Sequence, residues 1–423
     1  MTGPRVSSDE AAAADTGIGR RELLILVSSV MALMALGIDL MLPAFDDIRV
    51  AYDLGAGSNE TGQIVTVFFL GLAAAQLLYG PLADRFGRKP VLYLGIGISV
   101  VGAVGSALAP TFPLLLASRF VWGIGAAGAR VVATAIIRDC FVGDAMARAM
   151  SQIMAVFVLV PVVAPTLGAG LIAIFPWQSV FWFCVLWSAV IAAWALRLRE
   201  TLQPQNVRAL SVVGSVRSYR QVAREPVTLG YTMATVFIQA VMTSYLAVSE
   251  LIIGDIFDRK AQFPFFFGAV AASFGVAALV NGRLVERRGL DRMVNSAFAL
   301  NIPLSILLVV VSVASDGPPN IWLFMAILAG VLSSFMLLMP NLNTAAMTPM
   351  GEIAGSAAAF TGALRIAGGA VLAAIATRWV SDSVVPFAVS VLVFCCAAAA
   401  TVWVVRRQLE AKAVEPATSA VTG

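Results

Sequence analysis

Long apolar segments dominate this chain, and each is long enough to cross a lipid bilayer. A membrane-spanning helix needs about 20 apolar residues, and the sequence has room for about twelve such segments joined by short polar connections. Hydrophobic residues make up 60% of the chain and charged residues only 12%, whereas soluble domains carry about 25% charged residues. A helix satisfies its backbone hydrogen bonds within one segment, as lipid requires. The sequence therefore predicts an all-α integral membrane protein.

The apolar segments form two groups of six on either side of a polar stretch. They lie at about 23–43, 60–82, 90–110, 113–137, 150–174 and 178–198, then at about 227–253, 262–284, 290–314, 318–342, 355–380 and 383–406. We expect an N-terminal bundle of six transmembrane helices at 19–198, a linker at 199–226 and a second bundle of six at 227–408. Residues 1–18 and 409–423 are predicted to be disordered tails.

One charged loop recurs at the same place in both groups. It reads Gly80-Pro-Leu-Ala-Asp-Arg-Phe-Gly-Arg-Lys89 in the first and Gly282-Arg-Leu-Val-Glu-Arg-Arg-Gly289 in the second, so that Gly, Leu, an acid, Arg and Gly keep their offsets. We expect Gly80 and Gly87 to provide the backbone freedom of a reverse turn. The repeat predicts that the two six-helix bundles are pseudo-symmetric. Charged side chains are costly in lipid, so the charged residues of the first loop must face water: Asp84, Arg85, Arg88 and Lys89.

The basic residues set the orientation in the membrane. Most of the 28 Lys and Arg side chains lie in loops on one side of the predicted bilayer. The exceptions in loops on the other side are Arg49, Arg259, Lys260 and Arg378. Basic loops remain in the cytoplasm, so both termini are predicted to be cytoplasmic. A net charge of +4 scattered over short loops does not indicate a nucleic-acid partner.

The chain contains no histidine, which excludes histidine-based catalysis, most zinc sites and histidine proton relays. The four cysteines lie in or beside apolar segments without Cys-x-x-Cys pairing, as expected of buried thiols rather than of disulfides or metal ligands. No nucleotide loop or nucleophile arrangement appears, and an ATP-binding Gly-x-x-x-x-Gly-Lys-[Ser/Thr] motif is missing. We therefore expect neither an enzyme nor a cofactor or metal site, and any proton chemistry must use carboxylates.

Two charged residues inside the predicted spans are candidates for proton coupling, because charge within a span indicates function. Asp39 lies ~24 Å along the first helix from Leu23, and Arg119 lies ~9 Å below the outer end of the fourth helix. Their similar depth predicts a charge pair between them. The alternative for Asp39 is a cap at the outer end of the first helix. Arg130 either projects from nearly the same face as Arg119 or extends toward the inner surface.

The fifth span is interrupted by Pro161, Pro165, Gly168 and Gly170. Proline removes a helix hydrogen bond and glycine lets backbones approach, so we expect a bent, tightly packed helix. Helix packing alone would also explain this pattern. Polar residues elsewhere in the spans either line a substrate cavity or tie helices together. These candidates are Gln152, Gln239, Asn341 and Arg365 in addition to Asp39; Glu250 closes the seventh span as a functional acid or a solvated rim.

Over nearly its whole length the chain resembles the twelve-helix drug:proton antiporters of the major facilitator superfamily, and the bicyclomycin/chloramphenicol-resistance group in particular. The resemblance rests on Asp39-x-x-x-Pro43, the Gly80–Lys89 loop, Arg119-x-x-x-Gly123 and the Pro165–Gly170 segment. Alanine at 164, where the exporter motif often has glycine, and Trp122, where glutamine is common, are departures from the pattern.

This resemblance implies two bundles that alternate between inward-open and outward-open states around a central cavity. It implies that Gly80, Asp84, Arg85, Gly87 and Arg88 form a cytoplasmic gate motif, with Asp139 as the partner of one arginine. It also implies that Asp39 exchanges a proton in competition with substrate. Burial disfavours the charged form of a carboxylate and a nearby arginine favours it, so making or breaking an Asp39–Arg119 contact would move a proton.

The predicted function is therefore proton-coupled export of small amphipathic drugs or antibiotics across the bacterial inner membrane. The expected partners are a small-molecule substrate, protons and the lipid bilayer, with a monomer as the family default. An exporter or facilitator of one metabolite, such as a sugar or an amino acid, remains an alternative, and a receptor or channel is a third.

Overall fold

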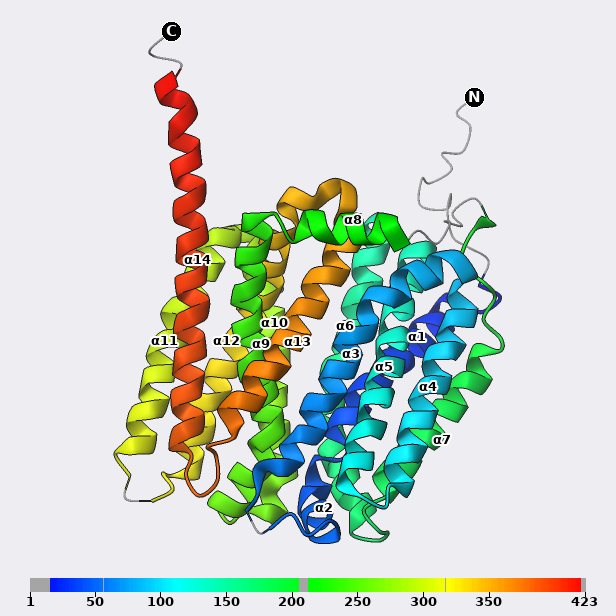
Figure 1. Ribbon diagram of the computed structural model, residues 1–423, viewed down its shortest axis with the longest axis vertical. Coiled ribbons are helices and arrows are strands. Elements are labelled where there is room, and N and C mark those ends of the chain that lie inside the picture. The colour runs from blue at the N-terminus through cyan, green and yellow to red at the C-terminus, as the bar shows by residue number, and fades with distance from the viewer. Residues whose placement is uncertain (1–15, 56, 205–211, 316, 420–423) are drawn as a thin grey trace, which may run out of the picture. The chain divides into compact units, whose positions relative to one another are not determined.

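The computed structural model describes residues 16–55, 57–204, 212–315 and 317–419 (Figure 1). Residues 1–15 of the predicted N-terminal tail lie outside these ranges. All regular elements within the described ranges are helices, which confirms the all-α fold class. Eleven helices are long and apolar enough to cross a membrane. The remaining predicted span, the sixth, corresponds to a shorter apolar helix of 17 residues.

The described residues form two compact units. The first comprises the described parts of residues 1–52 and 67–212, and the second those of residues 53–66 and 213–423. The main helices of the first unit are α1 (Arg20–Asp39), α2 (Phe45–Ala51), α3 (Gly62–Phe86), α4 (Arg88–Leu108), α5 (Phe112–Cys140), α6 (Gly143–Ile172) and α7 (Ser179–Ala195). A short helix η1 (Leu42–Ala44) joins α1 to α2, and η2 (Asn59–Thr61) precedes α3.

Apart from residues 53–66, the first helix of the second unit is α8 (Val212–Val222), which lies within the predicted linker. Its long helices are α9 (Pro226–Glu250), α10 (Phe263–Arg288), α11 (Leu290–Val313), α12 (Ile321–Met347), α13 (Ala354–Thr377) and α14 (Val385–Ser419). Three short helical turns connect them: η4 (Leu251–Ile256), η5 (Lys260–Gln262) and η6 (Thr348–Ile353). In this unit α9 packs against α12, α13 and α14, and α11 packs against α12 and α14.

Residues 53–66 belong to the second unit, whereas the sequence analysis placed them in the N-terminal bundle. Two contacts explain the difference. The side-chain amide of Asn59 donates hydrogen bonds to the carbonyls of Thr377 and Val380 at the end of α13. A Cβ at Gly62 would lie 3.0 Å from the carbonyl oxygen of Ala247 on α9. The connection before α3 therefore packs with helices of the second unit, which sequence spacing alone does not reveal.

Two sequence predictions about helix ends are corrected by the structure. Gly80 does not form part of a reverse turn, because α3 continues through it to Phe86. Only Gly87 breaks the helix, with a φ of 99° that favours glycine. At the other end of the chain, α14 extends to Ser419, beyond residue 408 where the predicted disordered tail begins. Leu409, Glu410 and Ala411 are good helix formers, so the backbone continues the helix after the apolar segment ends.

In the first unit, α5 packs closely against α3 and α4. A Cβ at Gly125 would lie 2.3 Å from the backbone nitrogen of Ser99 on α4, and one at Gly123 would lie 2.1 Å from the carbonyl oxygen of Phe68 on α3. Small residues at these positions let the helix backbones approach, as is common in membrane bundles. This packing fixes the position of α5, the helix that carries Arg119 and Asp139.

Candidate functional site

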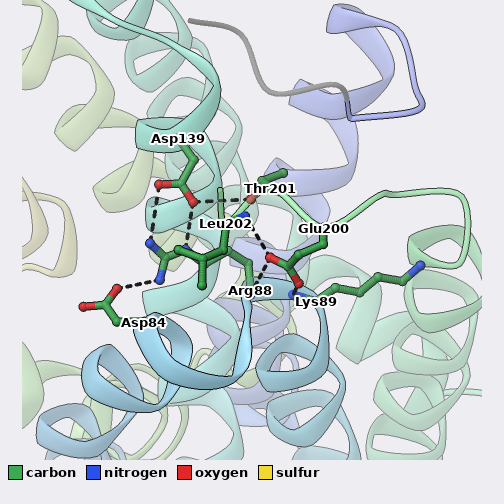
Figure 2. Close-up of polar contacts among 7 residues, drawn as sticks. All are labelled: Asp84, Arg88, Lys89, Asp139, Glu200, Thr201 and Leu202. Carbon is green, nitrogen blue, oxygen red and sulfur yellow. Dashed lines mark hydrogen bonds and ion pairs between the residues drawn. The ribbon is translucent and has the colours of Figure 1, made fainter. Parts of the chain in front are cut away.

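Arg88 is the centre of an ion-pair cluster at the end of the first unit where α3 turns into α4. Its Nη1 lies 2.6 Å from Oδ1 of Asp84, one turn earlier in the chain, and its Nε lies 2.8 Å from Oδ2 of Asp139 at the end of α5 (Figure 2). The Arg88 side chain is only 5% exposed. The predicted pairing of Asp139 with an arginine of the motif is therefore present. Arg85, by contrast, is exposed and has no ion pair with a described residue.

Glu200, which the sequence analysis did not single out, anchors the backbone beside this cluster. Its Oε1 accepts hydrogen bonds from the backbone N–H groups of Arg88 at 2.8 Å and Leu202 at 2.9 Å, and its Oε2 accepts one from Lys89 at 3.0 Å (Figure 2). The carboxylate thus occupies the N-terminus of α4, where unpaired N–H groups and the helix dipole favour an anion. Gly87 leaves room for it, because a Cβ there would lie 2.6 Å from Oε2 of Glu200.

Two further bonds tie the segment after α7 to the same cluster. The hydroxyl of Thr201 lies 3.4 Å from Oδ2 of Asp139, and Nζ of Lys89 donates to the carbonyl of Leu196 at 3.0 Å. The only sequence signal for Glu200 is its position directly after the sixth apolar segment. Its partners Arg88 and Lys89 lie more than a hundred residues away in the chain, so no local pattern predicts these contacts.

Arg119 is fully buried, and its surroundings differ from the predicted charge pair. Its Nη2 donates to the carbonyl of Gly37 at 2.7 Å, and its guanidinium carbon lies 4.7 Å from the ring centroids of both Phe68 and Trp122. Its Nε and Nη1 are buried without a hydrogen-bond partner. Arg119 has no ion pair with Asp39. The guanidinium lies against the last turn of α1 and contacts a carbonyl and two aromatic faces instead.

Asp39 is the last residue of α1 and is only 4% exposed. It follows Gly37, the partner of Arg119, by two residues. The Asp39 carboxyl has no ion pair in the described part of the chain. Asp39 thus lies at the end of its helix, as the alternative role of a helix cap requires. It is also a buried acid in the turn that Arg119 contacts. The structure therefore places Asp39 in the last turn of α1, which Arg119 contacts through the carbonyl of Gly37 and not through the Asp39 carboxyl.

The glycine–proline segment of α6 contacts the same end of α1. α6 is a continuous helix across both Pro161 and Pro165. A Cβ at Gly168 would lie 2.1 Å from the carbonyl oxygen of Leu40, the residue after Asp39. Gly170, in contrast, has no neighbour within 4 Å of such an atom. Of the two glycines, only Gly168 is required for close packing, and it packs next to the buried acid.

The predicted cavity residues are divided between the two units. In the first unit, Gln152 is exposed and lines a groove of about 320 Å³ between α1 and α6. In the second unit, Nη1 of Arg365 on α13 donates to Oε1 of Gln239 on α9 at 3.3 Å. Asn341 on α12 is buried and donates to Oδ1 of Asn281 on α10 at 2.9 Å. Asn341 therefore ties two helices together, which was one of its two expected roles.

Tyr52 lies just outside the first span and joins the end of α2 to the end of α4. Its hydroxyl donates to the carbonyl of Ala109 at 2.8 Å, and its ring contacts those of Phe112 and Trp177. Burial raises the pKa of Tyr52 above its usual value of 10.0, because the charged phenolate is disfavoured there.

The comparisons with known proteins agree with this fold. The sequence matches the Major Facilitator Superfamily over residues 27–373. It is 26% identical to a bicyclomycin resistance protein homolog of Haemophilus influenzae over 86% of this chain and 91% of that protein. It is also 35% identical to the multidrug resistance protein MdtL of Escherichia coli, over 44% of this chain and 47% of that protein. The crystal structure of a D-xylose–proton symporter superimposes with a TM-score of 0.71 at 12% identity, over 89% of this chain and 97% of the other.

The symporter likeness shows the fold, and the family match covers most of the chain, including the Arg88 cluster, Arg119 and Asp39. Homologues of this chain are named as drug-resistance proteins. The chain is a multi-pass membrane protein that belongs to the Major Facilitator Superfamily, a family of small-molecule transporters and not of enzymes.

Proposed function

We propose that this protein is a proton-coupled exporter of small amphipathic drugs or antibiotics, acting by alternating access in the bacterial inner membrane with both termini in the cytoplasm. The observation that carries the proposal is that the first unit buries an arginine and an aspartate that do not form an ion pair with each other. Arg119 keeps two buried guanidinium nitrogens without partners, and Asp39, two residues from its carbonyl partner, is 4% exposed without a counter-ion.

Such an arrangement supplies what proton exchange needs. A carboxylate that leaves water binds a proton more readily, and one that gains an arginine partner releases it. In the conformation that joins the two charges, α1 and α5 would be displaced or rotated so that the nitrogens of Arg119 without partners reach the carboxylate of Asp39. Proton binding and release by Asp39 would then be linked to conformational change, because each conformation favours one protonation state.

The packing of α6 supports the same role for this end of α1. Gly168 lies directly against the carbonyl of Leu40, so any movement of the segment that carries Asp39 is transmitted to α6. One wall of the groove that contains Gln152 belongs to α6. We propose that a substrate bound against α6 and the proton on Asp39 compete through this contact.

The Arg88 cluster is proposed to be the cytoplasmic gate of this transporter. Asp84 and Asp139 together hold the Arg88 guanidinium, and Glu200 holds the backbone from which it projects. A rigid, nearly buried arginine of this kind can serve as a fixed charge against which the cytoplasmic ends of helices close. The names of the drug-resistance relatives favour export as the direction of transport.

Proton release from everted membrane vesicles tests the proposal. Vesicles that contain the protein and a pH-sensitive dye are energised to be acid inside, and chloramphenicol, bicyclomycin or a lipophilic cation is added. We expect several unrelated compounds to release protons from the wild type and none to do so from Asp39→Asn. Asp144→Asn is the matched control, because it makes the same change at an exposed acid and should behave as the wild type.

Two results would contradict the proposal. Proton release that persists in Asp39→Asn would remove Asp39 as the coupling site. A wild type that responds to none of the compounds would instead indicate a narrow metabolite exporter or an uncoupled facilitator, and the drug assignment would be abandoned.

A further inference from the structure

An open groove with a mixed polar and apolar lining lies between α1 and α6. Its volume is about 320 Å³, within the range of about 300–1,000 Å³ that is usual for ligand pockets. Its polar lining consists of Arg21, Ser28, Ser29 and Gln152. Apolar side chains of Leu24, Ile25 and Val156 complete it.

Helix periodicity explains how these residues come to share one surface. On α1, residues 21, 24, 25 and 28 are three or four apart, and on α6 Gln152 and Val156 are four apart. Residues at these spacings line one helix face. Leu24, Ile25 and Val156 stay partly or largely exposed on that face, so the groove keeps an apolar surface free for a ligand.

The polar groups of the groove have no competing partners among the described residues, and all but Ser28, which is 6% exposed, lie at least partly at the surface. None of Arg21, Ser28, Ser29 and Gln152 makes a side-chain hydrogen bond or ion pair with another described residue. Together they offer a guanidinium, two hydroxyls and an amide. No acidic side chain lines the groove, so a cationic ligand would find a positive charge and no counter-charge there.

The charge of Arg21 is not neutralised by its neighbours in sequence. Glu22 accepts a hydrogen bond from Nε1 of Trp194 at 2.9 Å and lies 3.0 Å from Nη1 of Arg197, so it is engaged with α7 and the residues after it. Arg20 places its guanidinium carbon 5.1 Å from the ring centroid of Phe141. Adjacent arginines thus have different surroundings: one covers an aromatic ring, and the other lines the groove.

We propose that this groove selects amphiphiles that carry a carboxylate or a similar anionic group over lipophilic cations. Arg21 would bind the anionic group, the hydroxyls and Gln152 would orient it, and the apolar side chains would contact the body of the molecule. This inference rests on the proposed export of amphipathic compounds, since it names the class of compound that the exporter prefers.

Equilibrium binding to the purified full-length protein tests the inference apart from proton coupling. The probes are labelled nalidixate, which is an anionic amphiphile, chloramphenicol, which is uncharged, and tetraphenylphosphonium, which is a lipophilic cation. We expect nalidixate to bind most tightly and tetraphenylphosphonium most weakly. Arg21→Gln should weaken nalidixate binding about tenfold, as expected for one lost charge-assisted hydrogen bond, and Arg21→Lys should restore part of the loss.

Arg20→Gln is the matched control, because it removes the same charge one residue away but outside the groove. It should leave nalidixate binding within about twofold of the wild type, since the adjacent charge does not reach the ligand. Gln152→Leu, which removes the amide but keeps the volume, should weaken binding of nalidixate and chloramphenicol.

The inference would be overturned if Arg20→Gln and Arg21→Gln weakened nalidixate binding equally. It would also be overturned if tetraphenylphosphonium bound most tightly of the three probes. Neither result would affect the proposed proton coupling, which the vesicle experiment tests separately. Conversely, nalidixate binding that depends on Arg21 in a protein without proton release would support the groove and reject the coupled exporter.

Discussion

The close contact between Gly168 and Leu40 gives a prediction with an internal control. A Cβ added at Gly168 would lie 2.1 Å from the carbonyl oxygen of Leu40, whereas one added at Gly170 meets nothing within 4 Å. Favourable carbon–oxygen contacts are about 3.3–3.6 Å, so Gly168→Ala forces α6 and the end of α1 apart by roughly 1 Å. Gly170→Ala, in the same helix, requires no such displacement of the helices.

The size of the effect follows from two opposing contributions. Alanine is favoured over glycine within a helix by about 1 kcal/mol, and both variants receive this gain. Only Gly168→Ala incurs the cost of overpacking, typically about 1–3 kcal/mol. Gly168→Ala should therefore be about 1–3 kcal/mol less stable than Gly170→Ala. At roughly 2–4 °C per kcal/mol for a domain of about 200 residues, its unfolding midpoint should be about 2–12 °C lower.

A thiol-reactive dye provides the assay, because three of the four cysteines react only when the detergent-solubilised protein unfolds: Cys140, Cys184 and Cys395 are buried. We also expect Gly168→Ala to reduce drug-induced proton release, since it displaces the segment that carries Asp39, while Gly170→Ala transports normally. Equal unfolding midpoints for the two variants would refute the packing argument. Equal transport, despite different midpoints, would refute the link between α6 and Asp39.

Three further predictions concern the ends of the first unit. Arg88→Lys should lower both stability and transport, because one ammonium cannot form the paired bonds that the guanidinium makes with Asp139 while still reaching a second acid. Glu200→Ala should lower the free energy of unfolding by about 1 kcal/mol, because the N–H groups at the start of α4 lose their carboxylate acceptor, and Glu200→Gln by less, because its amide oxygen still accepts hydrogen bonds. The raised pKa of Tyr52 adds stability that is complete below pH 10 and is lost as the pH rises through that raised value, so thermal unfolding of Tyr52→Phe should depend less on pH in this range.

Each of these predictions has a result that would contradict it. Wild-type transport in Arg88→Lys would show that a point charge suffices at the gate. A Glu200→Ala protein as stable as the wild type would show that water replaces the carboxylate at α4. If alkaline conditions destabilise the wild type and Tyr52→Phe equally, other groups account for the pH dependence.

The fold could be predicted from the sequence because the bilayer permits few structures. The length of the apolar segments predicted the membrane spans. The repeated loop indicated two bundles, and the basic residues indicated their orientation in the membrane. The helix ends were harder. Gly80 looked like a turn residue, yet α3 continues through it to Phe86, because a helix end that projects into water can extend until a residue such as Gly87 stops it. A pairing of Asp139 with one of the motif arginines was expected, but the sequence did not say that the arginine is Arg88, and the role of Glu200 was not expected.

Sequence by itself determined which residues are costly to bury, and hence that Asp39, Arg119 and Arg88 deserve a functional interpretation. Only the tertiary structure decided what each of them contacts. The guanidinium of Arg119 lies against a carbonyl and two aromatic rings rather than the Asp39 carboxylate, and of the glycines in α6 only Gly168 lies against α1. Hydropathy and periodicity describe one helix at a time, whereas ion pairs and close contacts depend on the rotation and depth of neighbouring helices, which are set by packing between residues far apart in the chain.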